Sequence, residues 1–128
     1  MSHSGEPLQY LSTDWVDSTV MPGVRYLVRR VSLVLRTEIT RRVKKLLAEL
    51  EYREAGDSLE DRLSAALVAG QVDLAYLDWG LVRVQGLEID GCEATVQTLL
   101  ESGPEALSQE IAKVIRDRCR VTEPERKN

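Results

Sequence analysis

Apolar residues recur at every third or fourth position between Ser32 and Gly56, the longest periodic stretch of the chain. They are Leu35, Ile39, Val43, Leu46 and Leu50. Residues with this spacing lie along one side of an α-helix, and Arg41, Lys44 and Lys45 then fall on the opposite side. The pattern predicts a long amphipathic helix with its apolar stripe in the core and a basic outer side. Gly56 stands where a glycine in the left-handed conformation commonly ends a helix.

Two more helices are predicted after this one, separated at Gly70. Asp57 followed by Glu60 resembles a capping box at the start of the first of them. The apolar positions of this helix fall on one face: Leu59, Leu63, Ala66 and Leu67. The next helix, which starts near Val72 or Asp73 and has its apolar stripe from Leu74 to Val84, is so broadly apolar that we expect it to be the most buried one.

Gly80 lies in the middle of that apolar helix, where glycine costs about 1 kcal/mol relative to alanine. We expect it to permit the close approach of a neighbour. Two helices are predicted nearer the C-terminus, one around Thr95 to Glu101 and one that begins at Pro104. Four residues of the last helix are expected to face inward: Leu107, Ile111, Val114 and Ile115.

Two segments have extended rather than helical character. After the turn signal of Pro22 and Gly23, Val24, Tyr26 and Val28 alternate with Arg25, Leu27 and Arg29 as in a β-strand, although the valines also continue the helical stripe. The β-branched content favours a short strand. Gly86 to Gly91 is expected to be a short extended piece that ends in an Asp-Gly turn.

These elements define a mainly α fold, a small helical domain of about five helices with one or two short extended segments. Residues 21–121 are predicted to form this single domain. Residues 1–20 are polar and irregular and are expected to be a flexible arm, pinned to the domain by Tyr10, Leu11 and Trp15. Residues 122–128 are expected to be an exposed tail.

The composition, with 43% hydrophobic and 30% charged residues, is typical of a soluble globular domain. Phe is absent, so Leu, Val, Ile and Ala must fill the core, which favours helix-on-helix packing. The sequence shows no signal-peptide pattern and no apolar run near the roughly 20 residues needed to span a bilayer. Cys92 and Cys119 lie far apart without metal-ligand spacing. We therefore expect a cytoplasmic protein with two free thiols and no membrane contact.

Positive charge is concentrated between Arg25 and Lys45. This window holds eight of the 17 basic residues and a single acid, Glu38, and so carries +7 in a chain of net charge −4. Its helical part is a candidate partner-binding face, the basic face, formed by Arg36, Arg41, Arg42, Lys44 and Lys45. Additional contacts are expected from Arg25, Arg29 and Arg30. The alternative is that the acidic remainder of the chain packs near this window and neutralises it, or that water solvates it.

The residue patterns of catalytic and metal sites are missing from the sequence. Its single histidine, His3, falls in the predicted arm, so a Ser-His or Cys-His pair is not expected. No G-x-S-x-G, H-E-x-x-H or Walker-type motif occurs. Glu88 and Asp90 precede Gly91 as in a calcium loop, but the other ligand positions are lacking. We therefore predict a protein that is not an enzyme and uses no cofactor.

A small nucleic-acid-binding regulator is one alternative, with the segment from Arg25 to Lys45 neutralising phosphates. Only Tyr26 offers an aromatic ring for stacking within that segment. A long basic helix followed by an acidic one also does not match the two short helices of a helix-turn-helix. A protein-binding module is therefore the leading hypothesis, and a helical subunit whose purpose is oligomerisation is the third.

Several phrases occur along the chain in a distinctive order: VRYLVRRVS, a basic helix ending LEYREAGDSLED, YLDWGLVRVQGLEIDG, LLESGPEALSQEIAKVI and the charged tail ERKN. From about Val24 to Asn128 the chain resembles the small tail assembly chaperones of tailed bacteriophages and related prophages. The resemblance implies a mostly helical protein, often with an extended piece before the first helix. It implies no catalytic residues in this chain.

The same resemblance implies partners. A chaperone of this kind binds the tape measure protein during tail assembly, keeps it soluble and helps recruit tail tube subunits in the bacterial host cytoplasm. Family members often occur also in a longer form made by programmed frameshifting. Apolar grooves and complementary charge suit a long helical client, and assembly into a homo-oligomer is compatible with the role.

Overall fold

The computed structural model describes residues 5–120, which form four helices and five strands. Three strands make an antiparallel sheet in the order β1-β2-β3, namely β1 (Thr13–Asp17), β2 (Arg25–Arg29) and β3 (Leu81–Gln85). The other elements are α1 (Leu33–Glu54), α2 (Leu59–Gly80), β4 (Glu88–Ile89), β5 (Cys92–Glu93), α3 (Val96–Ser102) and α4 (Glu105–Cys119). The fold is therefore α/β, with more sheet than the predicted one or two extended segments.

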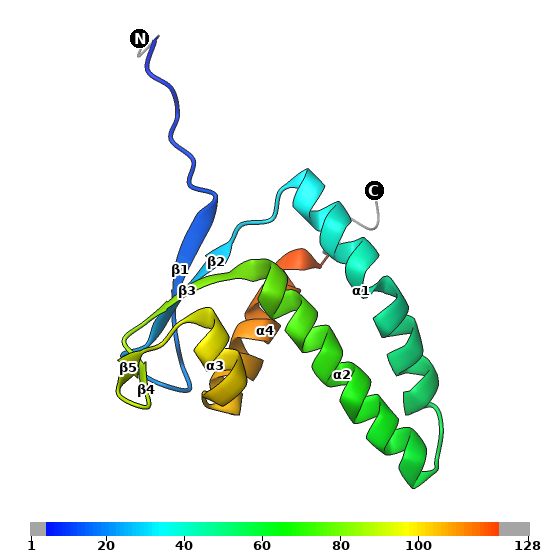
Figure 1. Cartoon of the computed structure of the whole chain (residues 1–128). Coiled ribbons are helices and arrows are strands. Elements are labelled where there is room, and N and C mark those ends of the chain that lie inside the picture. The colour runs from blue at the N-terminus through cyan, green and yellow to red at the C-terminus, as the bar shows by residue number, and fades with distance from the viewer. Residues whose placement is uncertain (1–4, 121–128) are drawn as a thin grey trace.

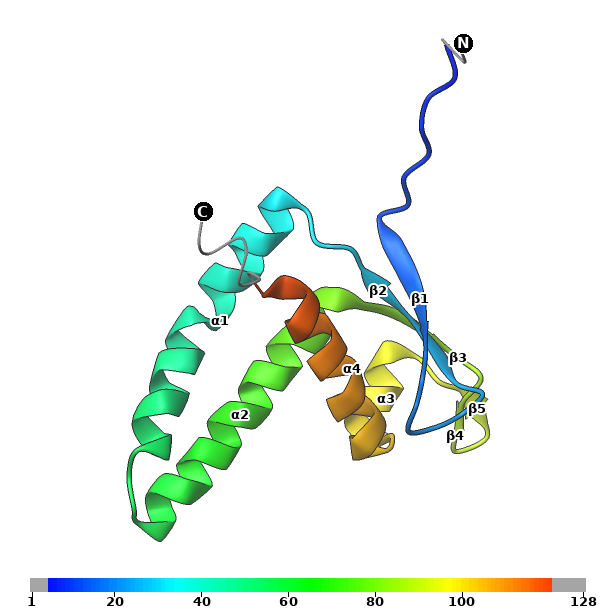
Figure 2. The same cartoon turned by 180° about the vertical axis from the view of Figure 1, so that it is seen from behind.

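The antiparallel pair α1 and α2 is inserted between β2 and β3, the two neighbouring strands of the sheet. Its closed end projects away from the sheet, as both views show (Figures 1 and 2). α4 packs against α2 nearer the sheet, and α3 lies beside it. Within residues 5–120, no helix is both long and apolar enough to cross a membrane.

The strand predicted for Val24 to Arg30 is confirmed as β2. Tyr26 and Val28 are fully buried, whereas Arg25 and Arg29 are exposed. This alternation follows from a sheet that is covered on one face only. The extended piece predicted before the Asp-Gly turn is also confirmed. Asp90 and Gly91 both have positive φ, as a two-residue hairpin turn between β4 and β5 requires.

The prediction of a flexible arm over residues 1–20 is wrong for its second half. Thr13–Asp17 pair with β2, with Trp15 opposite Leu27. Asp14 of this strand forms a 2.9 Å ion pair with Arg118 of α4. This strand is short and polar and has no hydrophobic period of its own. Its order therefore comes from pairing with β2 and from the ion pair with Arg118. Residues 1–4 and the tail predicted for residues 122–128 lie outside the described residues.

α1 confirms the long amphipathic helix. The Ser32 hydroxyl accepts a hydrogen bond from the Leu35 amide at 3.1 Å and caps the helix. The left-handed conformation predicted for Gly56 is wrong, because Gly56 is not among the residues with positive φ. A Cβ at this position would instead collide with the carboxyl of Asp61. A larger residue at position 56 would therefore require the side chain of Asp61 to move.

The two helices predicted after Gly56 are one helix of 22 residues, so the structure has four helices rather than about five. Gly70 does not break α2, because Val68 and Val72 on either side of it are buried in the core side of the helix. The cap is Ser58, one residue later than predicted. The helix ends at Gly80, and the apolar run that follows becomes β3 because it pairs with β2.

α4 supplies much of the core. Leu107, Ile111 and Ile115 are buried as predicted, whereas Val114 is half-buried. The close approach predicted at Gly80 is confirmed, because a Cβ there would lie 2.8 Å from Cγ2 of Ile115. The helix starts one residue after Pro104, which takes the cap position.

Candidate functional site

α2 is apolar on two opposite sides. The side that faces α1 and the body is buried and includes Val68, Val72, Ala75 and Trp79. Because each residue of an α-helix advances by about 100°, a second row of apolar residues lies on the other side. We call it the leucine stripe, and it consists of Leu59, Leu63, Leu67 and Leu74. Their exposed fractions are 67%, 63%, 65% and 51%, so no described element covers them.

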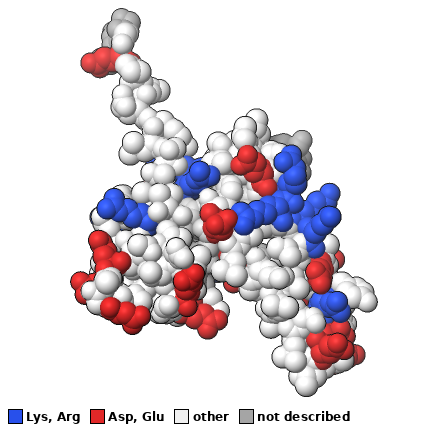
Figure 3. Space-filling view, in the orientation of Figure 1, with Lys and Arg blue, Asp and Glu red and all other residues white. Residues whose placement is uncertain are grey.

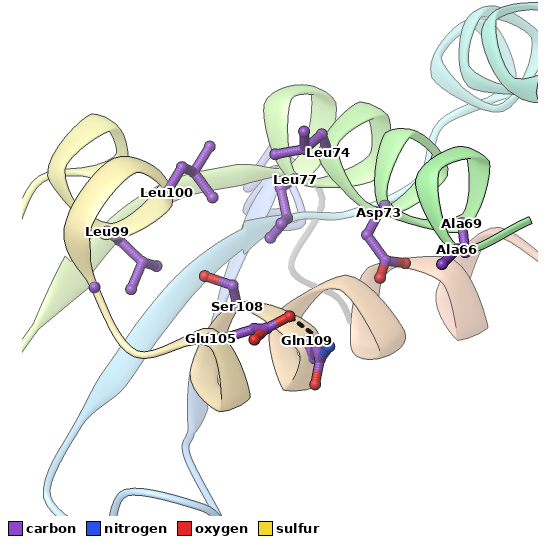
Figure 4. Close-up of a pocket in the computed structure, with 12 residues that line it drawn as sticks. Ala66, Ala69, Asp73, Leu74, Leu77, Leu99, Leu100, Glu105, Ser108 and Gln109 are labelled. Atoms are coloured by element: carbon purple, nitrogen blue, oxygen red, sulfur yellow. Dashed lines mark hydrogen bonds between the residues drawn. The ribbon is translucent and has the colours of Figure 1, made fainter. Parts of the chain in front are cut away.

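At its C-terminal end the leucine stripe leads into a groove between α2, α3 and α4, with a volume of about 630 Å³ (Figure 4). Leu77 of α2 and Leu99 of α3 form its buried floor. Leu74 and Leu100 stand at its rim, where they also border a second hollow of about 460 Å³ towards α1. Ser108 and Gln109 of α4 line the opposite wall. The groove therefore has an apolar floor and a partly polar margin.

Small residues continue the groove along α2 towards the closed end of the helical pair. Ala66, Ala69 and Gly70 line it. A Cβ at Gly70 would meet no atom within 4 Å, so nothing in residues 5–120 requires glycine at this position. Glycine in the interior of a helix costs about 1 kcal/mol relative to alanine. Its absent side chain leaves room for another backbone to approach α2 closely.

The charge around the groove is acidic. Asp73 and Glu105 line it, and no Lys or Arg within residues 5–120 does. Asp73 is neutralised by Arg116 at 3.2 Å. Glu105 accepts a hydrogen bond only from the amide of Gln109, at 3.2 Å, among the described residues. Figure 3 shows acidic side chains gathered over α3 and the β4–β5 hairpin, and basic ones over α1.

The residues of the predicted basic face have different surroundings in the structure. Arg41, Lys44 and Lys45 are exposed on the side of α1 turned away from α2, across the helical pair from the leucine stripe. Arg36 donates to the carbonyl oxygen of Cys119, and Arg42 forms a 2.9 Å ion pair with Asp78 of α2. Neutralisation within the chain, the alternative to partner binding, thus accounts for Arg42. A partner-binding role for the other residues stays a prediction.

The additional contacts were expected at Arg25 and Arg29 of β2 and at Arg30, which follows the strand. Arg25 stacks on the ring of Trp15, 4.2 Å from its centroid. Arg30 forms a 3.5 Å ion pair with Asp14. Arg29 is exposed. The eight cations singled out in the sequence therefore differ in their surroundings, and Arg30 and Arg42 are paired with carboxylates of the chain itself.

Glu110 is an inward-facing carboxylate that sequence reasoning missed. It accepts hydrogen bonds from the Ser18 hydroxyl at 2.7 Å, the Thr19 amide at 2.9 Å and the Tyr26 hydroxyl at 3.2 Å. Burial acts to raise the pKa of Glu110, but these bonds and one from Val20 outweigh it and hold the pKa below its ordinary value. Burial and the adjacent carboxylate raise the pKa of Tyr26. Because both side chains are engaged in these bonds, the cluster holds the β1–β2 connection against α4. It is not an acid–base pair with a free group for proton transfer.

The position of Glu110 is the signal that would have revealed it. It follows Leu107 by three residues, so it lies on the inward stripe of α4, where a carboxylate requires partners.

The described part of the chain holds no group of three His, Cys, Asp or Glu side chains placed to bind a metal ion. The groove and leucine stripe are thus the candidate site, and their chemistry is that of a docking surface. Comparisons with protein-family models, with curated proteins and with solved structures find no significant match.

Proposed function

We propose that the chain is a non-enzymatic protein-binding module that holds an amphipathic helix of a partner along the leucine stripe and in the adjoining groove. The observation that carries this proposal is the exposure of Leu59, Leu63 and Leu67 at helical spacing. Single exposed leucines are ordinary on protein surfaces. A contiguous apolar row rimmed by polar residues marks an interaction site.

The dimensions of the site suit a helix. From Leu59 to Leu77, α2 extends about 27 Å at 1.5 Å per residue, the length of roughly five helical turns. A helix laid in such a groove anchors itself through residues spaced three and four apart. The small residues Ala66 and Gly70 allow the two helix axes to approach to about 8 Å, the close end of the usual range.

The resemblance to tail assembly chaperones supplies an identity for the partner. In this proposal the client is the tape measure protein, whose helical segments would expose apolar stripes before the tail forms. The groove shelters one such stripe and keeps the client soluble while tail tube subunits are recruited. Binding alone is required, so the role needs no cofactor.

Arg41, Lys44 and Lys45 provide a second contact surface in this proposal. They are exposed and form no ion pair with any residue in the range 5–120. Acidic segments of the client or of a tail tube subunit would complement them. This surface and the groove lie on different sides of the helical pair, so variants can test them separately.

Co-expression with the tape measure candidate tests the function. We expect the chain to keep the client soluble and the double variant Leu63→Gln/Leu67→Gln to lose this activity. Full burial of each leucine is worth about 1.5–3 kcal/mol, so each substitution should weaken binding roughly tenfold or more. Leu33→Gln is the matched control, because Leu33 is 84% exposed on α1 and lies outside the groove.

Two results would contradict the proposal in different ways. If the unaltered chain leaves client solubility unchanged, the assignment of the tape measure protein as the client is wrong. If the double variant protects the client as well as the Leu33→Gln control does, the leucine stripe is not the binding site. Far-ultraviolet circular dichroism of each variant checks that the fold is retained.

A further inference from the structure

We infer that the open face of the β1-β2-β3 sheet binds single-stranded nucleic acid through one aromatic ring and three guanidinium groups. This inference goes beyond the proposed function, because it concerns a surface other than the leucine stripe and the groove. Successive residues of a strand point to opposite faces of its sheet. In β2, Tyr26 is fully buried and its hydroxyl bonds to Glu110 of α4. Arg25, Leu27 and Arg29 therefore point to the other face, which we call the open face.

Strand pairing places more side chains on the open face, because residues directly opposite each other in an antiparallel pair share a face. β1 contributes the three residues opposite Arg25, Leu27 and Arg29, and β3 contributes those opposite Arg25 and Leu27. The open face consists of Thr13, Trp15, Asp17, Arg25, Leu27, Arg29, Arg83 and Gln85. Three separate stretches of the sequence therefore form one surface.

Trp15 lies at the centre of the open face, opposite Leu27. Its side chain is half-buried, and the guanidinium carbon of Arg25 lies 4.2 Å from the centroid of its ring. Unpaired bases stack on aromatic rings and on guanidinium planes, so this pair offers a platform for stacking. The segment from Arg25 to Lys45 has no accessible ring by itself, because Tyr26 is fully buried. The pairing of β1 with β2 supplies the missing aromatic group.

The guanidinium groups of the open face are free to bind phosphate. Arg25, Arg29 and Arg83 are exposed, and they form no ion pair with any carboxylate in residues 5–120. All three cations are arginines, whose planar donors match phosphate oxygens in pairs. Two acids lie nearby, because Asp17 is opposite Arg25 and Glu93 borders the same hollow as Arg83. The excess of positive charge is therefore small, and we expect weak binding.

A single strand suits this surface better than a duplex. Each strand of five residues is about 17 Å long, and three strands are about 10 Å across. The open face can therefore hold about two or three nucleotides, as sheets that stack RNA bases do. In a duplex the bases stack on each other, so that only phosphate contacts remain. We expect a Kd of about 10–100 μM for a single strand at 0.1 M salt.

The test measures fluorescence anisotropy of labelled oligothymidine and oligouridine of about 12 nucleotides with the full chain. Three phosphate contacts predict a slope of about −2 when log K is plotted against log salt, since each contact to a single strand contributes about −0.7. A DNA duplex of the same length and an oligoglutamate peptide of similar charge should both bind more weakly. Binding of either oligonucleotide supports the inference, and the tighter of the two indicates DNA or RNA.

Variants locate the binding on the open face. Arg25→Gln/Arg29→Gln should reduce the salt slope to about −0.7. Trp15→Leu should weaken binding roughly 5- to 100-fold, whereas Trp15→Phe keeps a ring and should stay within about threefold. Asp17→Asn removes the one carboxylate of the open face and should tighten binding roughly 2- to 5-fold.

A matched control tests the other basic surface of the chain. Arg41→Gln/Lys44→Gln removes two exposed cations from α1 and should leave the slope for oligonucleotides unchanged. A loss as large as that of Arg25→Gln/Arg29→Gln would place the binding on α1 and overturn the inference.

Three other results would also overturn it. They are no binding at low salt, equal binding of the duplex or the oligoglutamate, and equal affinities for Trp15→Leu and Trp15→Phe. Circular dichroism checks the fold of each variant. If Trp15→Leu unfolds, the exposed pair Arg25→Gln/Arg29→Gln and the gain expected from Asp17→Asn still decide the question.

Discussion

The hydroxyl of Ser18 donates a 2.7 Å hydrogen bond to Oε1 of Glu110, which lies 92 positions further along the chain. The amide of Thr19 donates to Oε2 of the same carboxylate at 2.9 Å. These bonds fasten the connection between β1 and β2 to the middle of α4. A single carboxylate in the last helix therefore adds to the β2 pairing and the Asp14–Arg118 ion pair in holding the N-terminal strand.

Replacing Glu110 should loosen this fastening. Glu110→Gln exchanges a charged acceptor for an amide whose NH2 group faces the donors Ser18 and Thr19. We expect the free energy of unfolding, measured with urea, to fall by about 1–2 kcal/mol. Hydrogen exchange should speed up most in β1. Glu38→Gln, the same change at an exposed position of α1, is the control and should alter stability by less than about 0.5 kcal/mol.

Acid should remove the contribution of Glu110. Its pKa in the folded chain lies below the ordinary value of 4.5, so the unfolded chain binds the proton more readily. The stabilisation is complete above the ordinary pKa and is lost as pH falls through the folded pKa. The difference in unfolding free energy between the unaltered chain and Glu110→Gln should thus shrink between about pH 5 and pH 2. A constant difference over this range would mean that packing, not charge, is what the substitution disturbs.

Two glycines of α2 should respond to alanine in opposite directions. At Gly80 the new methyl would meet Ile115, whose side chain is buried, at 2.8 Å. We expect a loss of about 1–3 kcal/mol from overpacking, despite the better helix propensity of alanine. At Gly70 there is open space, so Gly70→Ala should stabilise the chain by about 0.5–1 kcal/mol. Thermal unfolding checks both, and stabilisation by Gly80→Ala would contradict the close contact of α2 with α4.

Charge reversal of the outer side of α1 should leave the fold intact. Arg41, Lys44 and Lys45 are exposed, so changing each to Glu should shift the unfolding free energy by no more than about 0.5 kcal/mol. The triple variant should bind the whole client less well. Loss of the fold would mean that this charge is balanced within the chain. Failure to weaken client binding would remove these residues from the contact surface.

The sequence by itself determined the elements whose signals are local. The apolar stripe of α1 repeats over so many turns that only one face of that helix can be buried, and Ile39 and Val43 are buried as the spacing requires. Leu107, Ile111 and Ile115 identify α4 in the same way. Asp90 and Gly91 form a tight turn because these residue types tolerate positive φ.

The tertiary structure decided everything that depends on a distant partner. Leu81–Gln85 has an apolar pattern that suits a helix or a strand, and pairing with β2 makes it β3. β1 exists because β2 and Arg118 are present to hold it. The spacing from Leu59 to Leu74 shows that these leucines share one face of a helix. Whether another element covers this face depends on the positions of α1, α3 and α4. Periodicity cannot show this, because it indicates which residues share a face of a helix but not which elements pack against that face.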